Sequence, residues 1–361
     1  MVGMRDVAKE AGVSLSTVSL VVNKTGYVSD DMRARVKAAM KELNYVPNEL
    51  ARNLYKNRTN LVGVIVPTIR HPFFATLTAH LQRELAAQGL RTMLCSTADA
   101  ENGEVEYVDM LRRHMMDGII VCSHTTHPND YWTSIHRPIV AFDRVLGGGI
   151  ASIGSDHEHG GRLMAHMLVN TGAHHVVMIG GPRDQFFDLA ARNGDSPDDF
   201  DLHKTTFQAV RYYLTLEQEL KAAGVRYEYV EAGNVEDFQG YKNAVNAVLN
   251  SMPVDGVDAV VSSDIGAALC VREAMRRHIS IPRDLQIIAY DGTYLTDLAG
   301  MKMTAVAQNF DKIAQVAVGN IVRAIAKEGD AKADTTSATG RKPYEPDVLI
   351  PVTRKLGDTT R

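Results

Sequence analysis

The chain has 361 residues, of which 45% are hydrophobic and 23% charged, so it is ordinary globular material with room for two or three cores. No stretch approaches the roughly 20 apolar residues of a membrane-spanning helix, and we expect a cytoplasmic protein. The net charge of −4 is distributed unevenly, because residues 1–60 hold ten Lys and Arg against six Asp and Glu. A basic beginning joined to an acidic remainder favours a nucleic-acid contact made by the first segment alone.

Two short helical patterns meet at a tight turn within residues 6–23. In the first, Val7, Ala8 and Ala11 share one face, and Gly12 can adopt the positive φ that the turn requires. Ser14 is a natural N-cap for the second helix, whose valines point inward. A helix-turn-helix protein places base-reading side chains on the outer face of this second helix. The residues predicted to contact DNA there are Leu15, Ser16, Thr17, Ser19, Leu20 and Asn23.

The remaining elements divide into a helical part and an alternating part. A third helix is predicted over residues 29–44, and Pro47 ends the helical pattern before a short further helix over 49–55. From Leu61 onward, short apolar runs alternate with amphipathic or loop stretches. These runs cover residues 61–66, 90–95, 118–122, 138–143, 176–180, 259–262 and 286–291. The alternation is typical of parallel sheets joined by crossover helices, and the number of strands suits two Rossmann-like subdomains.

The first 58 residues carry a specific signature: D-V-A-x-x-A-G-V-S-x-x-T-V-S, then V-S-x-x-x-R, then L-N-Y-x-P-N-x-x-A-R-x-L. This signature, with nearly all of the chain that follows, resembles the lactose-repressor/galactose-repressor family of bacterial transcription regulators. The resemblance implies a helix-turn-helix headpiece over 1–46, a hinge helix and linker over 47–60, and an effector-binding and dimerisation domain over 61–361. That domain is expected to be periplasmic-binding-protein-like, with lobe one at about 61–160 and 294–322 and lobe two at about 161–293 and 323–361.

The resemblance further implies that the hinge helix inserts into the minor groove of an operator. Leu54 matches the residue that, with its twin from a second subunit, opens a central base step. A leucine that only packs against a neighbouring helix is the alternative. Tyr55 departs from the family pattern, in which a small or basic residue is more usual. The hinge residues predicted to contact DNA are Asn48, Arg52, Leu54 and Tyr55.

Candidates for effector contacts follow the carboxyl ends of the predicted parallel strands, where such sheets bind ligands. Phe73 and Phe74 follow the first strand, and they are either effector contacts or ordinary core residues. Asp156 and Asp291 follow two later strands. Two carboxylates at one cleft suit acid/base catalysis or the recognition of sugar hydroxyls. Recognition is favoured, because neither a nucleophile–base pair nor metal-ligand spacing accompanies them.

The family pattern adds further candidate positions around the same cleft. Arg144 matches a position that contacts the effector or forms an ion pair between the lobes. The other matching positions are Ser263, Asp264 and Gln308. Arg211 is the nearest candidate for the arginine that clamps the effector in the family, although it is one residue out of register.

Two departures from the family pattern affect the expected ligand. An inserted-looking stretch occupies residues 184–204. Val235 stands where the family has an aromatic residue, with Phe238 as a substitute. We therefore expect an effector that the well-studied relatives do not recognise.

We conclude from the sequence that this is a regulator that binds a pseudo-palindromic operator and responds to a small effector, most simply a sugar. An enzyme on the same sheets and a constitutive architectural DNA-binding protein are the alternatives. No catalytic residue, cofactor or metal site is predicted; the glycine pairs fit no nucleotide loop, and the three widely spaced cysteines fit no zinc or disulfide pattern. The expected partners are operator DNA and a second copy of the chain, as a homodimer or higher oligomer, with no membrane partner.

Overall fold

The computed structural model describes residues 2–47, 58–98, 100, 103–123, 127–183, 205–329 and 346–361. The chain divides into two compact units, residues 1–59 and residues 60–361. The hinge helix predicted over 49–55, the hinge residues from Asn48 to Tyr55 and the inserted-looking stretch 184–204 lie outside the described residues. Among the described residues, no helix combines the length and the apolar character that crossing a membrane requires.

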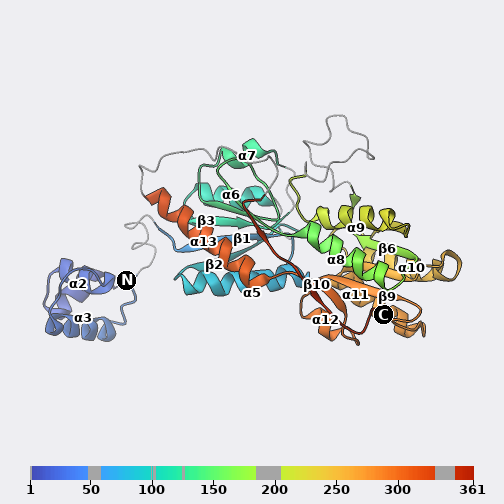
Figure 1. Cartoon of the computed structure of the whole chain (residues 1–361). Helices are drawn as coiled ribbons and strands as arrows, with labels where there is room; N and C mark the ends of the chain where they lie inside the picture. Colours follow the sequence, from blue (N-terminus) through green and yellow to red (C-terminus); the bar gives the residue numbers. More distant parts are fainter. Residues whose placement is uncertain are drawn as a thin grey trace. The chain divides into compact units, whose positions relative to one another are not determined.

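The first unit is a three-helix headpiece, as predicted. Its helices are α1 (Met4–Ala11), α2 (Leu15–Asn23) and α3 (Asp30–Glu42) (Figure 1). Gly12 takes a φ of +59° at the turn after α1, and the Ser14 side chain caps α2 by accepting a hydrogen bond from the Thr17 amide at 3.1 Å. The buried side chains that hold the helices together are Val7, Ala8, Ala11, Val18, Val21, Val28, Val36 and Ala39.

The second unit contains two six-stranded sheets, which define two lobes. Lobe one has the strand order β11-β5-β4-β3-β1-β2, and lobe two has the order β12-β10-β9-β8-β6-β7. All pairings are parallel except that of β12 with β10. The lobe-one strands are β1 (Leu61–Val66), β2 (Arg91–Ser96), β3 (Gly118–Val121), β4 (Ile139–Phe142), β5 (Ala151–Ser155) and β11 (Val348–Ile350). The lobe-two strands are β6 (His175–Gly180), β7 (Arg226–Glu231), β8 (Ala259–Ser263), β9 (Gln286–Asp291), β10 (Thr304–Ala307) and β12 (Thr353–Lys355).

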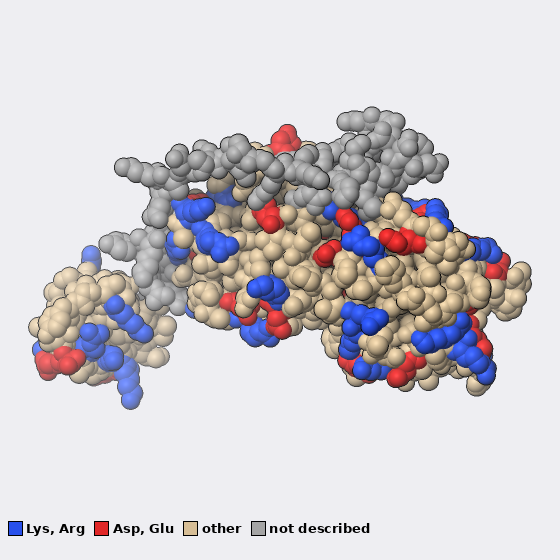
Figure 2. Space-filling model, viewed as in Figure 1, with Lys and Arg blue, Asp and Glu red and all other residues tan. Residues whose placement is uncertain are grey.

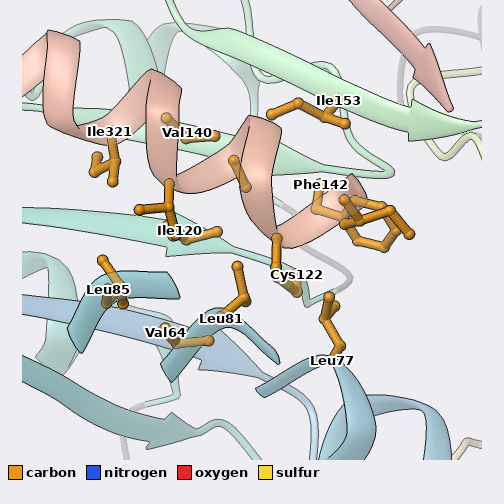
Figure 3. Close-up of a cluster of buried hydrophobic side chains, with 14 of the residues drawn as sticks. Val64, Leu77, Leu81, Leu85, Ile120, Cys122, Val140, Phe142, Ile153 and Ile321 are labelled. Atoms are coloured by element: carbon orange, nitrogen blue, oxygen red, sulfur yellow. The ribbon is translucent and has the colours of Figure 1, made fainter. Parts of the chain in front are cut away.

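Helices cover both faces of the lobe-one sheet. They are α5 (Pro72–Ala87), α6 (Glu104–Arg112), α7 (Asn129–Thr133) and α13 (Phe310–Gly329). Figure 3 shows one face, where Leu77, Leu81 and Leu85 of α5 and Ile321 of α13 point toward the strand residue Ile120. The opposite face is filled by a second apolar cluster that includes the buried Trp132 of α7. The amphipathic stripes of α5 and α13 thus share one core with a nearly all-apolar sheet.

Lobe two has the same layered arrangement, with α10 (Phe238–Asp255) and α11 (Asp264–Arg276) on one face and α8 (His157–Asn170) and α9 (Val210–Ala222) on the other. A short α12 (Leu295–Leu298) contacts α11. The close approach of α8 and α9 depends on Gly161, where an added Cβ would lie 2.8 Å from the Tyr212 carbonyl oxygen.

Two of the three passages of the chain between the lobes differ from the predicted boundaries. The first, after β5, agrees with the expected position near residue 160. The second follows β10 and the third lies between β11 and β12, so the expected crossings near 293 and 322 are wrong. The physical reason is that β10 pairs with β9, whereas all of α13 packs on lobe one, beside strands far from it in the chain (Figure 1). Cys95, Cys122 and Cys270 are buried free thiols, as expected.

Candidate functional site

The headpiece presents the predicted outer face of α2. Leu15 and Ser16 are exposed, whereas Thr17, Ser19 and Asn23 are half-buried. The Asn23 amide donates a hydrogen bond to the Ser19 hydroxyl at 3.1 Å, which orders one side of this face. Figure 2 shows Lys and Arg side chains over the visible face of the headpiece, beside a group of acidic side chains. Small uncharged side chains on the helix, with cations around it, suit close approach to a DNA groove.

Leu20 has a mixed environment in the headpiece. Its side chain is half-buried and packs against the headpiece core, and a Cβ added to Gly26 would lie 3.1 Å from its Cδ2. Part of the side chain nevertheless remains accessible on the second helix. Its contact with a base therefore stays a prediction. Tyr27, in the loop after α2, is 92% exposed and was not singled out from the sequence.

A cavity of about 400 Å³ lies between the two lobes at the carboxyl ends of their strands. Its lobe-one wall includes Pro67, His71, Phe73, Phe74, Thr97, Ala98, Cys122, Phe142, Asp143 and Arg144. Its lobe-two wall includes Gly181, Phe207, Ala209, Val210, Tyr212, Tyr213, Asn234, Val235, Glu236, Tyr241, Ser263, Tyr290 and Asp291. His157 and Gln308, from the passages between the lobes, complete it. An apolar pocket with a few convergent polar groups is the usual form of a small-molecule site.

Two chains of polar contacts connect the lobes along one side of the cavity. In the first, His157 lies between lobe-one Asp143, 3.0 Å from its Nε2, and the hydroxyl of lobe-two Tyr290, 2.7 Å from its Nδ1. In the second, Gln308 accepts a hydrogen bond from the Ser155 hydroxyl at 2.6 Å and donates one to Asp291 Oδ1 at 2.9 Å. Cavity-lining groups of both lobes are thus tied to the passages of the chain between them.

Asp291 is the carboxyl group of the described cavity lining whose pKa departs most from its ordinary value. Burial raises its pKa well above the ordinary value, and the nearby Asp264 carboxyl adds to this, whereas the Gln308 hydrogen bond opposes it. Its φ of +119° is rare for a residue with a side chain and indicates a backbone held by its surroundings. Burial also raises the pKa of Asp264 to about 6, although the Thr293 hydroxyl and amide both donate to it at 2.6 Å.

Aromatic rings form the other walls of the cavity. The Tyr212 and Tyr290 rings stack with centroids 3.8 Å apart and planes at 6°, and Tyr213 stacks on Tyr212 at 3.9 Å. Phe73 is only 8% exposed and contacts Phe142 as well as Phe74, so it belongs both to the core and to the lining. Ring faces of this kind can pack against the C–H faces of a sugar while carboxylates bind its hydroxyls.

Six of the nine predicted effector residues line the cavity, and three do not. The six are Phe73, Phe74, Arg144, Ser263, Asp291 and Gln308. Asp156 instead caps α8 by accepting a hydrogen bond from the His159 amide at 3.0 Å. Arg211 is buried and pairs with Glu158 at 3.6 Å, and Asp264 is bound to the loop after β9.

Sequence reasoning missed several lining residues. They are Asp143, His157, Phe207, Tyr212, Tyr213, Tyr241 and Tyr290. Four of them adjoin residues that were singled out: Asp143 precedes Arg144, His157 follows Asp156, Tyr290 precedes Asp291, and Tyr212 follows Arg211. For Asp143, His157 and Tyr290, the end of a predicted strand was therefore the sequence feature that could have identified them. Val235 lines the cavity as the departure at that position suggested, but its suggested substitute Phe238 does not appear in the lining.

A helix-turn-helix headpiece in one chain with a two-lobed domain around a central cavity defines a ligand-responsive DNA-binding regulator. Residues 3–48 match the model described as bacterial regulatory proteins, lacI family. Residues 59–194 match periplasmic binding proteins and sugar binding domain of LacI family, and residues 165–342 match a periplasmic binding protein-like domain.

Named relatives agree with these matches. The chain is 34% identical over 325 residues to the sucrose operon repressor of Streptococcus mutans, covering 89% of this chain and 92% of that protein. It is 33% identical to the ribose operon repressor of Bacillus subtilis, covering 81% and 82%. The chain therefore belongs to the lacI family of bacterial regulatory proteins.

Solved structures confirm the predicted fold class. The lac repressor dimer bound to operator has a TM-score of 0.77 at 21% identity, with 99% of both chains covered. The CelR–cellobiose complex has a TM-score of 0.63 at 23% identity, with 99% of this chain and 100% of that chain covered. The prediction of a DNA-binding transcriptional regulator, and not an enzyme, is confirmed by the family and by the repressors that the chain matches.

Proposed function

We propose that the protein is a cytoplasmic repressor that binds a pseudo-palindromic operator as a homodimer and changes its operator affinity when a small sugar occupies the cavity between the lobes. The observation that carries this proposal is the cavity itself, where Asp291 and Gln308 present hydrogen-bonding groups beside stacked tyrosine rings. Carboxylate and amide groups bind sugar hydroxyls, and aromatic faces bind the ring. Relatives named for sucrose and ribose operons, and the CelR complex with cellobiose, point to the same ligand class.

The homodimer follows from the size of the headpiece. One unit of three short helices offers few phosphate and base contacts, so a single copy should bind DNA weakly. Two copies related by a two-fold axis would read both halves of a pseudo-palindrome and bind tightly, with strong salt dependence. The structure of the lac repressor dimer bound to operator, to which the fold of this chain is similar, supports a homodimer.

Coupling between the cavity and DNA would run through the passages between the lobes. A ligand that binds one arrangement of the lobes better than another shifts the population toward it, by as much as its differential affinity. Asp291 accepts a hydrogen bond from the Gln308 side chain, which in turn accepts one from the Ser155 hydroxyl of lobe one. A sugar hydroxyl that binds Asp291 therefore acts next to the groups that connect the lobes.

Binding of DNA and sugars to the full-length protein tests the proposal. Sites selected from random duplexes supply an operator, and fluorescence anisotropy then measures its affinity with and without a panel of mono- and disaccharides. We expect at least one sugar to change operator affinity. Asp291→Asn should weaken that sugar's binding by about 1–3 kcal/mol and leave operator affinity without sugar unchanged.

The matched control is Asp358→Asn, which makes the same change at an exposed aspartate of lobe two. It should alter neither measurement. Equal losses of DNA binding and folding stability in Asp291→Asn would instead show that Asp291 has a structural role. A monomer that binds one half-site as tightly as a whole site would contradict the homodimer.

A further inference from the structure

The described lining of the cavity has an excess of acidic groups. Three carboxylates, Asp143, Glu236 and Asp291, face a single residue of the Lys or Arg type, Arg144. His71 adds no positive charge, because burial lowers its pKa to about 4. The charge of Arg144 therefore decides whether this wall can receive an anionic group of a ligand.

Arg144 is held by groups of the protein itself. Its side chain is buried, and its Nε donates a hydrogen bond to the Ser123 carbonyl oxygen at 2.9 Å. The guanidinium carbon lies 3.5 Å from the centroid of the Phe207 ring. A ring face carries partial negative charge and stabilises a guanidinium stacked on it. One face of the planar cation is thus covered by Phe207.

The position of Phe207 is set by backbone pairing across the lobes. Arg144 and Phe207 form an antiparallel bridge, flanked by hydrogen bonds from the Val145 amide to the Thr206 carbonyl at 3.1 Å and from the Gln208 amide to the Asp143 carbonyl at 3.2 Å. The Phe207 amide also donates to the Thr205 hydroxyl at 3.1 Å. The ring is therefore placed on Arg144 by two short segments that are themselves fixed.

Building on the proposed function, we propose that Phe207 determines specificity: by stacking on the Arg144 guanidinium it holds the N–H groups of this cation against backbone carbonyl oxygens, so that the cavity accepts uncharged sugars and rejects their phosphorylated forms. A phosphate bound in a protein is normally met by charge-assisted hydrogen bonds from Arg, Lys or backbone amides. Here a phosphate would lose its hydration beside Asp143 and Asp291, while Arg144 Nε and Nη1 donate to the Ser123 and Asp143 carbonyl oxygens. An uncharged hydroxyl can donate to the same carboxylates.

The raised pKa of Asp291 also supports the exclusion of phosphorylated sugars. Burial and the neighbouring Asp264 and Asp143 carboxyls all raise its pKa. The surroundings of this wall therefore already disfavour negative charge, and a phosphate would add two more charges to it.

Isothermal titration calorimetry of the full-length protein with matched pairs tests the proposal. The pairs are the sugars of the operator-binding panel, each with its own monophosphate, such as sucrose with sucrose 6-phosphate and ribose with ribose 5-phosphate. For the pair that binds best, we expect the uncharged sugar to bind at least 100-fold more tightly than its phosphate. Tighter binding of the phosphate would overturn this inference and leave a sugar-responsive regulator intact. Binding by no member of any pair would overturn both proposals.

Two variants test the role of Phe207 itself. Phe207→Leu keeps an apolar side chain but removes the ring, and Phe207→Ala uncovers the guanidinium further. Each should narrow the preference for the uncharged sugar at least tenfold, and thermal unfolding confirms that the variants are folded. Phe74→Leu is the matched control, because Phe74 lines the cavity and its described ring contacts are with His71 and Phe73. It should affect both members of a pair alike. An unchanged preference in Phe207→Leu would overturn the role of Phe207.

Discussion

The Gln308→Leu variant would test the hydrogen-bonded connection between the lobes. Leucine has a similar volume but can neither accept from the Ser155 hydroxyl nor donate to Asp291 Oδ1, so two buried groups lose their partner. Leaving one buried polar group unpaired costs roughly 1–3 kcal/mol, and the buried leucine offsets a part of the loss. We expect the free energy of unfolding of the second unit to fall by about 2–4 kcal/mol at pH 7.

This loss should depend on pH in a defined direction. The pKa of Asp291 is raised in the folded state, so folding binds protons and stability falls as pH rises above the ordinary carboxyl range near 4. The Gln308 hydrogen bond lowers that pKa, and its removal raises the pKa further. The difference between Gln308→Leu and wild type should therefore be smallest at low pH and should grow as pH rises through the raised pKa of Asp291.

Denaturant unfolding at pH 5 and pH 8 measures both effects. Trp132 is the only tryptophan of the chain and is buried in lobe one, so its fluorescence reports on the unit that contains Gln308. The matched control is Gln315→Leu, at an exposed position on α13, the helix that follows Gln308, and it should change stability by less than about 0.5 kcal/mol. A loss in Gln308→Leu that equals the control, or that shrinks as pH rises from 5 to 8, would refute the reasoning.

Two further predictions concern base reading and helix packing. Leucine at position 20 can contact a thymine methyl group but cannot form a hydrogen bond with guanine. Leu20→Arg should therefore move the base preference toward guanine at one symmetric operator position by about 1–3 kcal/mol. Identical motifs selected from random duplexes by the wild type and by Leu20→Arg would show that Leu20 reads no base. Gly161→Ala should lower stability by about 1–3 kcal/mol although alanine favours helices, because the added methyl group would lie 2.8 Å from the Tyr212 carbonyl oxygen. Gly148→Ala, where an added Cβ meets no atom within 4 Å, is its control, and equal thermal stability of the two variants would contradict the packing argument.

Local patterns were sufficient for the headpiece and for the class of the second unit. The turn at Gly12, the cap at Ser14 and the third helix depend on residues a few positions apart, where backbone geometry and side-chain hydrogen bonds act directly. The apolar runs of the buried strands likewise reflect burial on both faces of a parallel sheet. β7, at a sheet edge, alternates polar and apolar residues from Arg226 to Glu231 and was not recognised as a strand.

Only the tertiary structure decided which lobe each late element joins and which polar groups meet. The positions of β10 and α13 depend on pairing and packing with strands distant in sequence, which no local pattern encodes. For the same reason Asp143 and Tyr290 come together through His157, although the two residues lie far apart in the chain. A strand end marks a residue as available to a cavity. Whether its side chain lines the cavity, as for Asp291, or caps a helix, as for Asp156, depends on the three-dimensional neighbours that compete for it.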